Sequence, residues 1–323
     1  MGAHQFTSAT TVDDVVHVNP ALSRTLNAHG LDTCCGGSAT LAEAAHVRDI
    51  DLGELLTALN REGEPRKQSA TVATELPGHC VESACKVSAL PAPPPRVAVA
   101  VPLVPRPTRY IRFFTASLLF ALTFGSTLGA LTLATLTLPW NFLGGLPTAS
   151  TKVAHGYAQV FGFAALFVMG VAYHVIPRFK GAPLAVPGVA SASFWLQVGG
   201  VLAIAVGLLA GPPVVGPMRF VGAIALFAAA LGFGWVVHRS LAAGAPTPER
   251  FERYLRAGCV WLVVAAMLAV VTAAGVDSLQ PTVWEAALWG FGASWILGMS
   301  LRIVPVFLGL PPVSHHGSSA LFA

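Results

Sequence analysis

The distribution of hydrophobic residues divides the chain into a polar first third and an apolar remainder. Six unbroken apolar runs lie at roughly 113–138, 154–176, 190–210, 218–238, 257–275 and 284–304. Because a helix rises about 1.5 Å per residue, each run is long enough to cross the roughly 30 Å hydrocarbon core of a bilayer. The pattern predicts a six-helix transmembrane bundle over 109–310 and a C-terminal tail over 311–323.

Residues 1–60 have the shorter pattern of a small soluble helical domain. The segment TVDDVVHVNPALSRTLNAHG predicts two short helices, the second beginning near Pro20 and ending at Gly30. Thr40 and Glu43 have the spacing of a capping box at the start of a third helix. A fourth helix has one apolar face, formed by Leu52, Leu55, Leu56 and Leu59. The predicted fold class is therefore all-α, with a soluble domain ahead of the bundle.

Two of the apolar runs resemble each other. The segments FGFAALFVMGVAYHVIPRFKG (161–181) and WGFGASWILGMSLRIVPVFLG (289–309) align without gaps. The shared positions are Gly162/Gly290, Phe163/Phe291, Gly170/Gly298, Pro177/Pro305, Phe179/Phe307 and Gly181/Gly309. The alignment predicts an internal repeat and hence a pseudo-symmetric bundle.

The low content of charged residues indicates a membrane protein, and the distribution of Arg and Lys predicts its orientation. Charged residues make up 11% of the chain, against roughly 25% in a soluble domain. No basic stripe with interleaved aromatic residues is present, so nucleic acid is not a predicted partner. On the expected inner side lie Arg106, Arg109, Arg112, Arg178, Lys180, Arg239, Arg250, Arg253, Arg256 and Arg302, and on the outer side Lys152 and Arg219. This asymmetry predicts a plasma-membrane (inner-membrane) protein whose N-terminal domain and C-terminus are cytoplasmic.

The segment HGLDTCCGG (29–37) holds the most unusual chemistry of the soluble domain. Its adjacent thiols, Cys34 and Cys35, are expected between two helices, where a helix N-terminus would lower a thiol pKa. Gly36 and Gly37 leave the sulfur atoms accessible, and His29 is available as a ligand or base. Iron, an iron–sulfur cluster, zinc or a redox partner would suit this pair; the alternative is that the thiols are incidental loop residues. The chain begins MGAHQFTSATTVDD, without the features of a signal peptide, so the thiols are expected to be reduced.

Residues 61–108 are rich in proline and predict an extended linker. The linker contains GHCVESAC, with His79, Cys80 and Cys85. The spacing suits a metal or a disulfide, and it forms a weaker candidate site than the cysteine pair.

The segment from about residue 12 to residue 60 resembles the short N-terminal domain of the ScdA/RIC iron–sulfur cluster repair family. The resemblance rests on Gly-Leu-Asp-x-Cys-Cys-Gly-Gly followed by Leu41 and Glu43. It implies a role in nitrosative or oxidative stress, with the cysteine pair handling metal or redox chemistry. In that family a His- and Glu-rich bundle holding two irons follows; this chain has apolar runs instead, so di-iron chemistry is not carried over.

His155, at the outer start of the second run, is an ionisable group within an apolar helix and hence a candidate functional residue. An α-helical period places Gln159, Gly162, Leu166, Met169 and Tyr173 near its face, and Gly162 would leave room for a haem ring. His174 lies about 28 Å away along the helix and, with His238 on the fourth run, could form a separate inner-side site. For all three histidines the alternative is interfacial position or hydrogen-bonded helix packing.

The surroundings of His155 resemble a helix of haem–copper oxidase subunit I and the NnrS family of haem- and copper-containing membrane proteins. The matching segments are AHGYAQVFGF, IPRFKGAP and SFWL. The resemblance implies b-type haem on His155 and a nitric-oxide response. The copper-site histidines of the oxidases are absent, and Met218 is the one intrachain sulfur partner that the sequence suggests for a haem.

These features lead to three functional hypotheses. The first is a thiol module tethered to a haem-binding membrane bundle in the nitric-oxide or iron–sulfur stress response. The second is a non-catalytic membrane anchor for a cluster-repair domain, and the third is a small-solute transporter. Lipid, iron–sulfur proteins and further subunits or copies of the chain are the expected partners. No reaction is indicated, so the sequence leaves open whether the protein is an enzyme.

Overall fold

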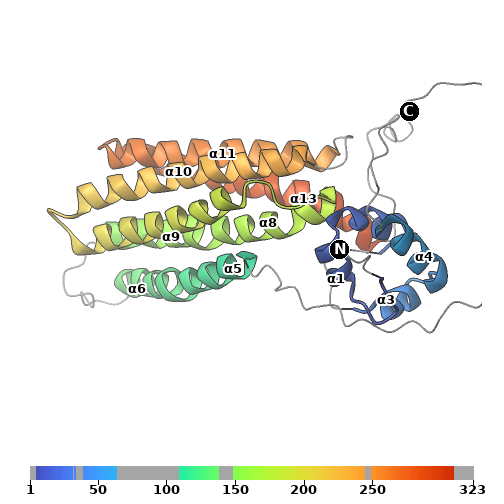
Figure 1. Cartoon of the computed structure of the whole chain (residues 1–323). Coiled ribbons are helices and arrows are strands. Elements are labelled where there is room, and N and C mark those ends of the chain that lie inside the picture. The colour runs from blue at the N-terminus through green and yellow to red at the C-terminus, as the bar shows by residue number, and fades with distance from the viewer. Residues whose placement is uncertain are drawn as a thin grey trace, which may run out of the picture.

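A computed structural model describes residues 5–31, 33, 39–63, 109–137, 148–243 and 249–308. Within these ranges the chain is helical and has no strand, only an isolated bridge between Thr11 and Thr40. A small helical domain lies against one end of a bundle of long helices (Figure 1). The predicted all-α class is confirmed.

The soluble domain packs short helices around an apolar core. The helices are α1 (Val12–Val18), the 3-10 turn η1 (Pro20–Leu22), α2 (Ser23–Ala28), α3 (Leu41–Val47) and α4 (Leu52–Gly63). Leu55 and Leu59 of α4 are fully buried, and Leu52 and Leu56 pack against the same core, as the leucine face predicted. Gly30 has a φ of 77°, the left-handed conformation that ends α2.

Six helices in the described part of the chain are long and apolar enough to cross a membrane: Tyr110–Ala134, Ala149–Lys180, Pro187–Ala210, Val215–Ala242, Arg250–Ala273 and Asp277–Pro305. The first span contains α5 (Arg109–Phe120), η2 (Ala121–Gly125) and α6 (Ser126–Thr137), and the second contains α7 (Thr148–Tyr157), η3 (Ala158–Ala165) and α8 (Leu166–Lys180). The third, fourth and fifth spans are α9 (Pro187–Ala210), α10 (Val215–Ala242) and α11 (Arg250–Ala273). The sixth contains η4 (Asp277–Leu279), α12 (Gln280–Glu285), η5 (Ala286–Gly292) and α13 (Ala293–Phe307). The six long apolar helices that hydrophobicity predicted are present, and most extend beyond the predicted runs because the helices continue into their polar ends.

Small residues at helix contacts and an exposed apolar surface characterise the bundle. A Cβ atom on Gly200 would lie 2.8 Å from the Gly222 carbonyl oxygen, and one on Gly222 would lie 2.7 Å from that of Gly200, so α9 and α10 approach with backbones in contact. Large apolar side chains point outward, among them Leu122, Trp289 and Ile296. An exposed apolar surface of this kind is typical of contact with lipid.

The second and sixth spans share local features that the sequence repeat anticipated. Each contains a π-helical segment, and the two segments begin at the aligned residues Ala158 and Ala286. The aligned glycines also have equivalent roles. Gly162 accommodates Phe120 of the first span, while Gly290 accommodates Trp261 of the fifth. The repeat thus extends to how each span packs on the span before it.

Candidate functional site

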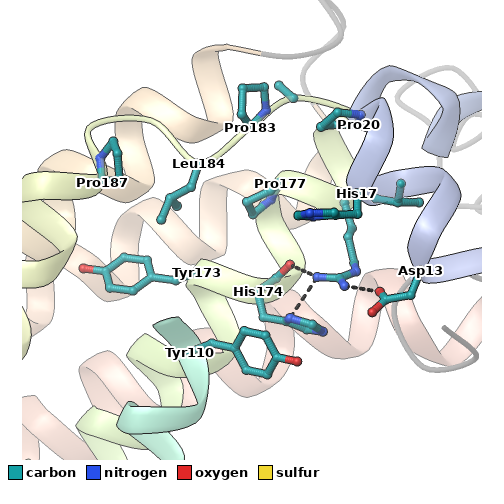
Figure 2. A pocket seen from close by; sticks show the side chains of 13 residues that line it. Asp13, His17, Pro20, Tyr110, Tyr173, His174, Pro177, Pro183, Leu184 and Pro187 are labelled. Atoms are coloured by element: carbon teal, nitrogen blue, oxygen red, sulfur yellow. Dashed lines mark hydrogen bonds and ion pairs between the residues drawn. The ribbon is translucent and has the colours of Figure 1, made fainter. Parts of the chain in front are cut away.

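The soluble domain contacts the bundle at the end of the second span. Arg178 of α8 forms an ion pair with Asp13 of α1, and both side chains are largely buried (Figure 2). Gly181, which ends α8 with a φ of 59°, lies against the soluble domain. A Cβ atom there would be 3.1 Å from Ser23 Oγ and 3.2 Å from the Pro20 carbonyl oxygen. Two reasons explain a glycine at this position: the close approach leaves no room for a side chain, and a residue with a side chain would be strained in this backbone conformation.

Arg178 also orients a histidine at this junction. One guanidinium nitrogen donates to His174 Nδ1 at 2.8 Å and to the His174 carbonyl oxygen at 3.0 Å. Because arginine only donates, Nδ1 must accept, and the ring proton of the neutral imidazole lies on Nε2. The His174 ring lies 4.1 Å from the Tyr110 ring of α5, measured between centroids. The second span, the first span and the soluble domain are therefore linked through His174 and Arg178.

A cavity of about 390 Å³ lies between the soluble domain and the bundle. Its lining combines Asp13 and His17 of α1 with Tyr110, His174 and Arg178 of the first two spans. Figure 2 shows Pro183 and Leu184 of the loop that follows α8, and Pro187 at the start of α9, on the other side of the cavity.

A buried ion pair lies at the same end of the bundle. Lys180 Nζ donates to Glu252 Oε1 of α11 at 2.8 Å, and both side chains are only 2% exposed. The other oxygen of Glu252 accepts from Arg256 at 3.0 Å. Ionised groups in such a location are costly unless paired, so this contact fixes the end of the second span to the start of the fifth.

The cysteine pair and its glycines, residues 34–37, lie outside the described residues. The flanking chain is well anchored: Leu31 and Thr33 are buried, and α3 begins with the predicted capping box. The Thr40 backbone N–H donates to the Glu43 carboxylate and thereby lowers its pKa. His29 caps α2 through its backbone N–H.

Because Cys34 and Cys35 lie outside the described residues, the expectation that the mouth of α3 activates a thiol stays a prediction, but the described part of α3 bears on it. Its first backbone N–H groups are already occupied. Those of Leu41 and Ala42 donate to the carbonyl oxygens of Thr10 and Ser8, at 2.8 and 3.1 Å. That of Glu43 donates to Thr40 Oγ1 at 3.2 Å. Because these donors are used and a carboxylate already lies in the first turn, α3 offers little stabilisation to a thiolate.

The side chain of His155, a residue of the second span, packs against the first span. Its Nδ1 lies 2.7 Å from the Gly125 carbonyl oxygen, and a Cβ atom on Gly129 would lie 2.9 Å from its Cε1. The space predicted beside Gly162 for a flat ring is filled, because a Cβ atom on Gly162 would lie 2.8 Å from Phe120 Cγ. The residues around His155 therefore do not fit a haem along this face.

Residues 8–62 match a family model. The model is ScdA_N, described as "Domain of Unknown function (DUF542)". The soluble domain is an ScdA_N domain. The match spans α1 to α4, includes the Cys-Cys-Gly-Gly segment and ends before the first span. No curated protein and no solved structure matches the chain. The protein thus joins an ScdA_N domain to a multi-pass membrane region.

Of the remaining candidate residues, Met218 does not form a site with His155, and His238 does not form one with His174. Met218 packs against Gly207 of α9, whereas His155 faces the first span. His238 is exposed on α10 and does not line the cavity that includes His174. Within the described residues no group of three His, Cys, Asp or Glu side chains could hold a metal ion. The linker residues His79, Cys80 and Cys85 lie outside the described part of the chain, as does the tail 311–323.

The two residues that form ion pairs at the end of the second span, Arg178 with the ScdA_N domain and Lys180 within the bundle, were not singled out by the sequence pattern. Arg178 and Lys180 were interpreted only as topology determinants at the inner end of a span. The signal that could have separated them is the pair of charges within one helical turn beside a glycine, "RFKG".

Proposed function

We propose that the protein is a membrane-anchored iron–sulfur cluster maintenance factor. Its ScdA_N domain presents the Cys34–Cys35 pair at the cytoplasmic surface of the membrane, in the nitrosative-stress response. The observation that carries the proposal is the attachment of this domain to the bundle through Asp13, Arg178 and Gly181. Attachment would hold a metal-handling module close to membrane-associated iron–sulfur proteins, which are the proposed partners.

In this proposal the bundle is an anchor and His155 has a structural role. The hydrogen bond to Gly125 satisfies one ring nitrogen, and Gly129 provides space for the ring. An iron ion or an iron–sulfur cluster at the cysteine pair is part of the proposal, because adjacent thiols on a glycine-rich segment are suitable ligands for iron. No step of the proposed function involves haem.

The proposal is tested by recovery of an iron–sulfur enzyme after nitric-oxide exposure. Cells that lack the protein should recover aconitase activity slowly, and the full chain should restore the rate. The Cys34→Ser/Cys35→Ser double variant should fail to do so. Cys259→Ala is the matched control, because Cys259 is a buried cysteine within the fifth span and is expected to be dispensable. Full complementation by the double variant would refute the proposal.

The proposed orientation predicts where a C-terminal fusion lies. Arg112, Arg178, Lys180 and Arg256 lie at the bundle end that contacts the ScdA_N domain, and such residues favour the cytoplasmic side. A reporter fused after Ala323 is expected to be active only in the cytoplasm. Activity on the other side of the membrane would require an odd number of spans or the opposite orientation.

The occupied N-terminus of α3 leads to a prediction for thiol reactivity. In the metal-free protein, alkylation of Cys34 and Cys35 followed against pH should have a midpoint near the ~8.5 of a free cysteine. The alkylated residues are identified by mass spectrometry, with Cys259 as the unreactive buried reference. A midpoint well below ~8.5 would show that another group activates the pair and would contradict the prediction.

The structural role of His155 predicts that the purified protein has no Soret band. His155→Ala should lower the stability of the bundle by about 1 kcal/mol, a typical value for one hydrogen bond between transmembrane helices. The measurements are an absorption spectrum and unfolding in detergent. A Soret band that disappears in His155→Ala but persists in His174→Ala would instead establish haem ligation.

A further inference from the structure

The cavity between the ScdA_N domain and the bundle has the composition of a ligand site, independently of the cysteine pair. At about 390 Å³ it falls within the size range of small-molecule pockets. Its walls are mainly apolar, with prolines and Leu184 on one side and the rings of Tyr110 and His174 on the other. A flat apolar molecule would fill this space and contact both walls.

The polar groups in the cavity wall include hydrogen-bond donors. His174 carries its proton on Nε2, because Arg178 occupies Nδ1. Arg178 Nε and His17 Nε2 are buried and have no partner among the described residues. Buried polar groups without partners are uncommon, and they favour a ligand or water that satisfies them. The expected ligand therefore carries oxygen atoms that accept hydrogen bonds.

The electrostatics of the cavity favour an uncharged ligand. The Arg178 charge is neutralised by the ion pair with Asp13, so an anion would gain little attraction there. A metal ion is also disfavoured, because the described residues contain no group of three His, Cys, Asp or Glu side chains that could ligate it. The cavity lies at the ends of the first and second spans, a position that a lipid-dissolved molecule can reach.

We propose that this cavity binds a quinone head group. A quinone is flat, uncharged and largely apolar, and its two carbonyl oxygens accept hydrogen bonds. His174 Nε2 and Arg178 Nε would donate to the carbonyls, while Leu184 and the prolines would contact the ring. The proposal goes beyond the role assigned to the cysteines, and it concerns binding only.

The test uses the full chain in lipid nanodiscs and a photoreactive azido-ubiquinone, with mass spectrometry to locate the label. Labelling is expected within residues 173–187 or beside Tyr110 and should be displaced by ubiquinone-1. Leu184→Trp fills the cavity and should reduce this labelling at least about tenfold, a loss of about 1.4 kcal/mol. Leu133→Trp is the matched control on α6, where Leu133 is 61% exposed, and should leave labelling unchanged.

A second pair of variants tests the hydrogen bonds without filling the cavity. His174→Gln keeps an acceptor for Arg178 and a donor for the ligand, so labelling should stay close to that of the wild type. His174→Leu removes both and should reduce labelling at least about fivefold, as expected for one lost hydrogen bond. Wild-type labelling of Leu184→Trp, labelling spread over lipid-facing residues, or displacement by inorganic phosphate would each overturn the proposal.

Discussion

Replacing Glu252 by alanine is expected to destabilise the bundle by about 3–5 kcal/mol, the usual cost of removing one partner of a buried ion pair. Glu252 accepts from Lys180 at 2.8 Å, and both side chains are 2% exposed. The substitution leaves the Lys180 ammonium buried after the loss of this carboxylate. Unfolding in detergent, followed by circular dichroism, measures the loss of unfolding free energy.

Two control variants separate charge burial from other consequences of the substitution. Asp277→Ala removes a carboxylate that is 73% exposed and pairs with Arg219 at 3.0 Å, so it should change stability by at most about 1 kcal/mol. The double variant Lys180→Met/Glu252→Met replaces the pair by apolar side chains and should recover most of the lost stability. A Glu252→Ala protein as stable as the wild type would contradict the interpretation of this contact.

Replacing Arg178 by glutamate is expected to release the ScdA_N domain from the bundle. The substitution places a carboxylate opposite Asp13 and removes the donor to His174 Nδ1. Because Asp13 and Arg178 are largely shielded from solvent, repulsion between them is weakly screened. We expect the docking equilibrium to shift at least about tenfold, or about 1.4 kcal/mol. Amide hydrogen exchange at residues 21–24 in the full chain should become correspondingly faster.

The control for this prediction is Arg219→Glu, which reverses a charge in the ion pair with Asp277 at the opposite end of the bundle. It should leave exchange in the ScdA_N domain unchanged. Adding Asp13→Arg to Arg178→Glu restores opposite charges and should restore part of the protection. If Arg178→Glu left exchange at residues 21–24 unchanged, docking would not depend on this ion pair.

The elements of the fold were predictable because local patterns determine them. Hydrophobic length gave the six spans, and Thr40, Glu43 and Gly30 marked helix ends whose backbone groups need particular partners. The partners of Arg178 and Lys180 were not predictable. Their contacts with Asp13 and Glu252 depend on which helix ends meet in space, and one sequence contains no information about such pairings beyond charge.

The environment of His155 shows a second limit of sequence patterns. The expectation of a shared face from His155 to Tyr173 assumed an α-helical period, but η3 is π-helical over Ala158–Ala165. In a π-helix each backbone hydrogen bond spans five residues instead of four, so the residues that follow η3 are rotated relative to that face. The role of Gly162 also depended on Phe120, a residue of another span. Neither the change in period nor the neighbouring side chain can be inferred from the glycine itself.

The central claim, that the ScdA_N domain is held against the bundle, can be measured directly by the distance between two spin labels. Labels attached to keto amino acids at Val47, 78% exposed on α3, and Tyr254, 42% exposed on α11, leave every native cysteine in place. Pulsed electron paramagnetic resonance on the full chain in nanodiscs should give one narrow distance distribution that broadens in Arg178→Glu. A broad distribution in the wild type, indistinguishable from that of Arg178→Glu, would contradict the claim.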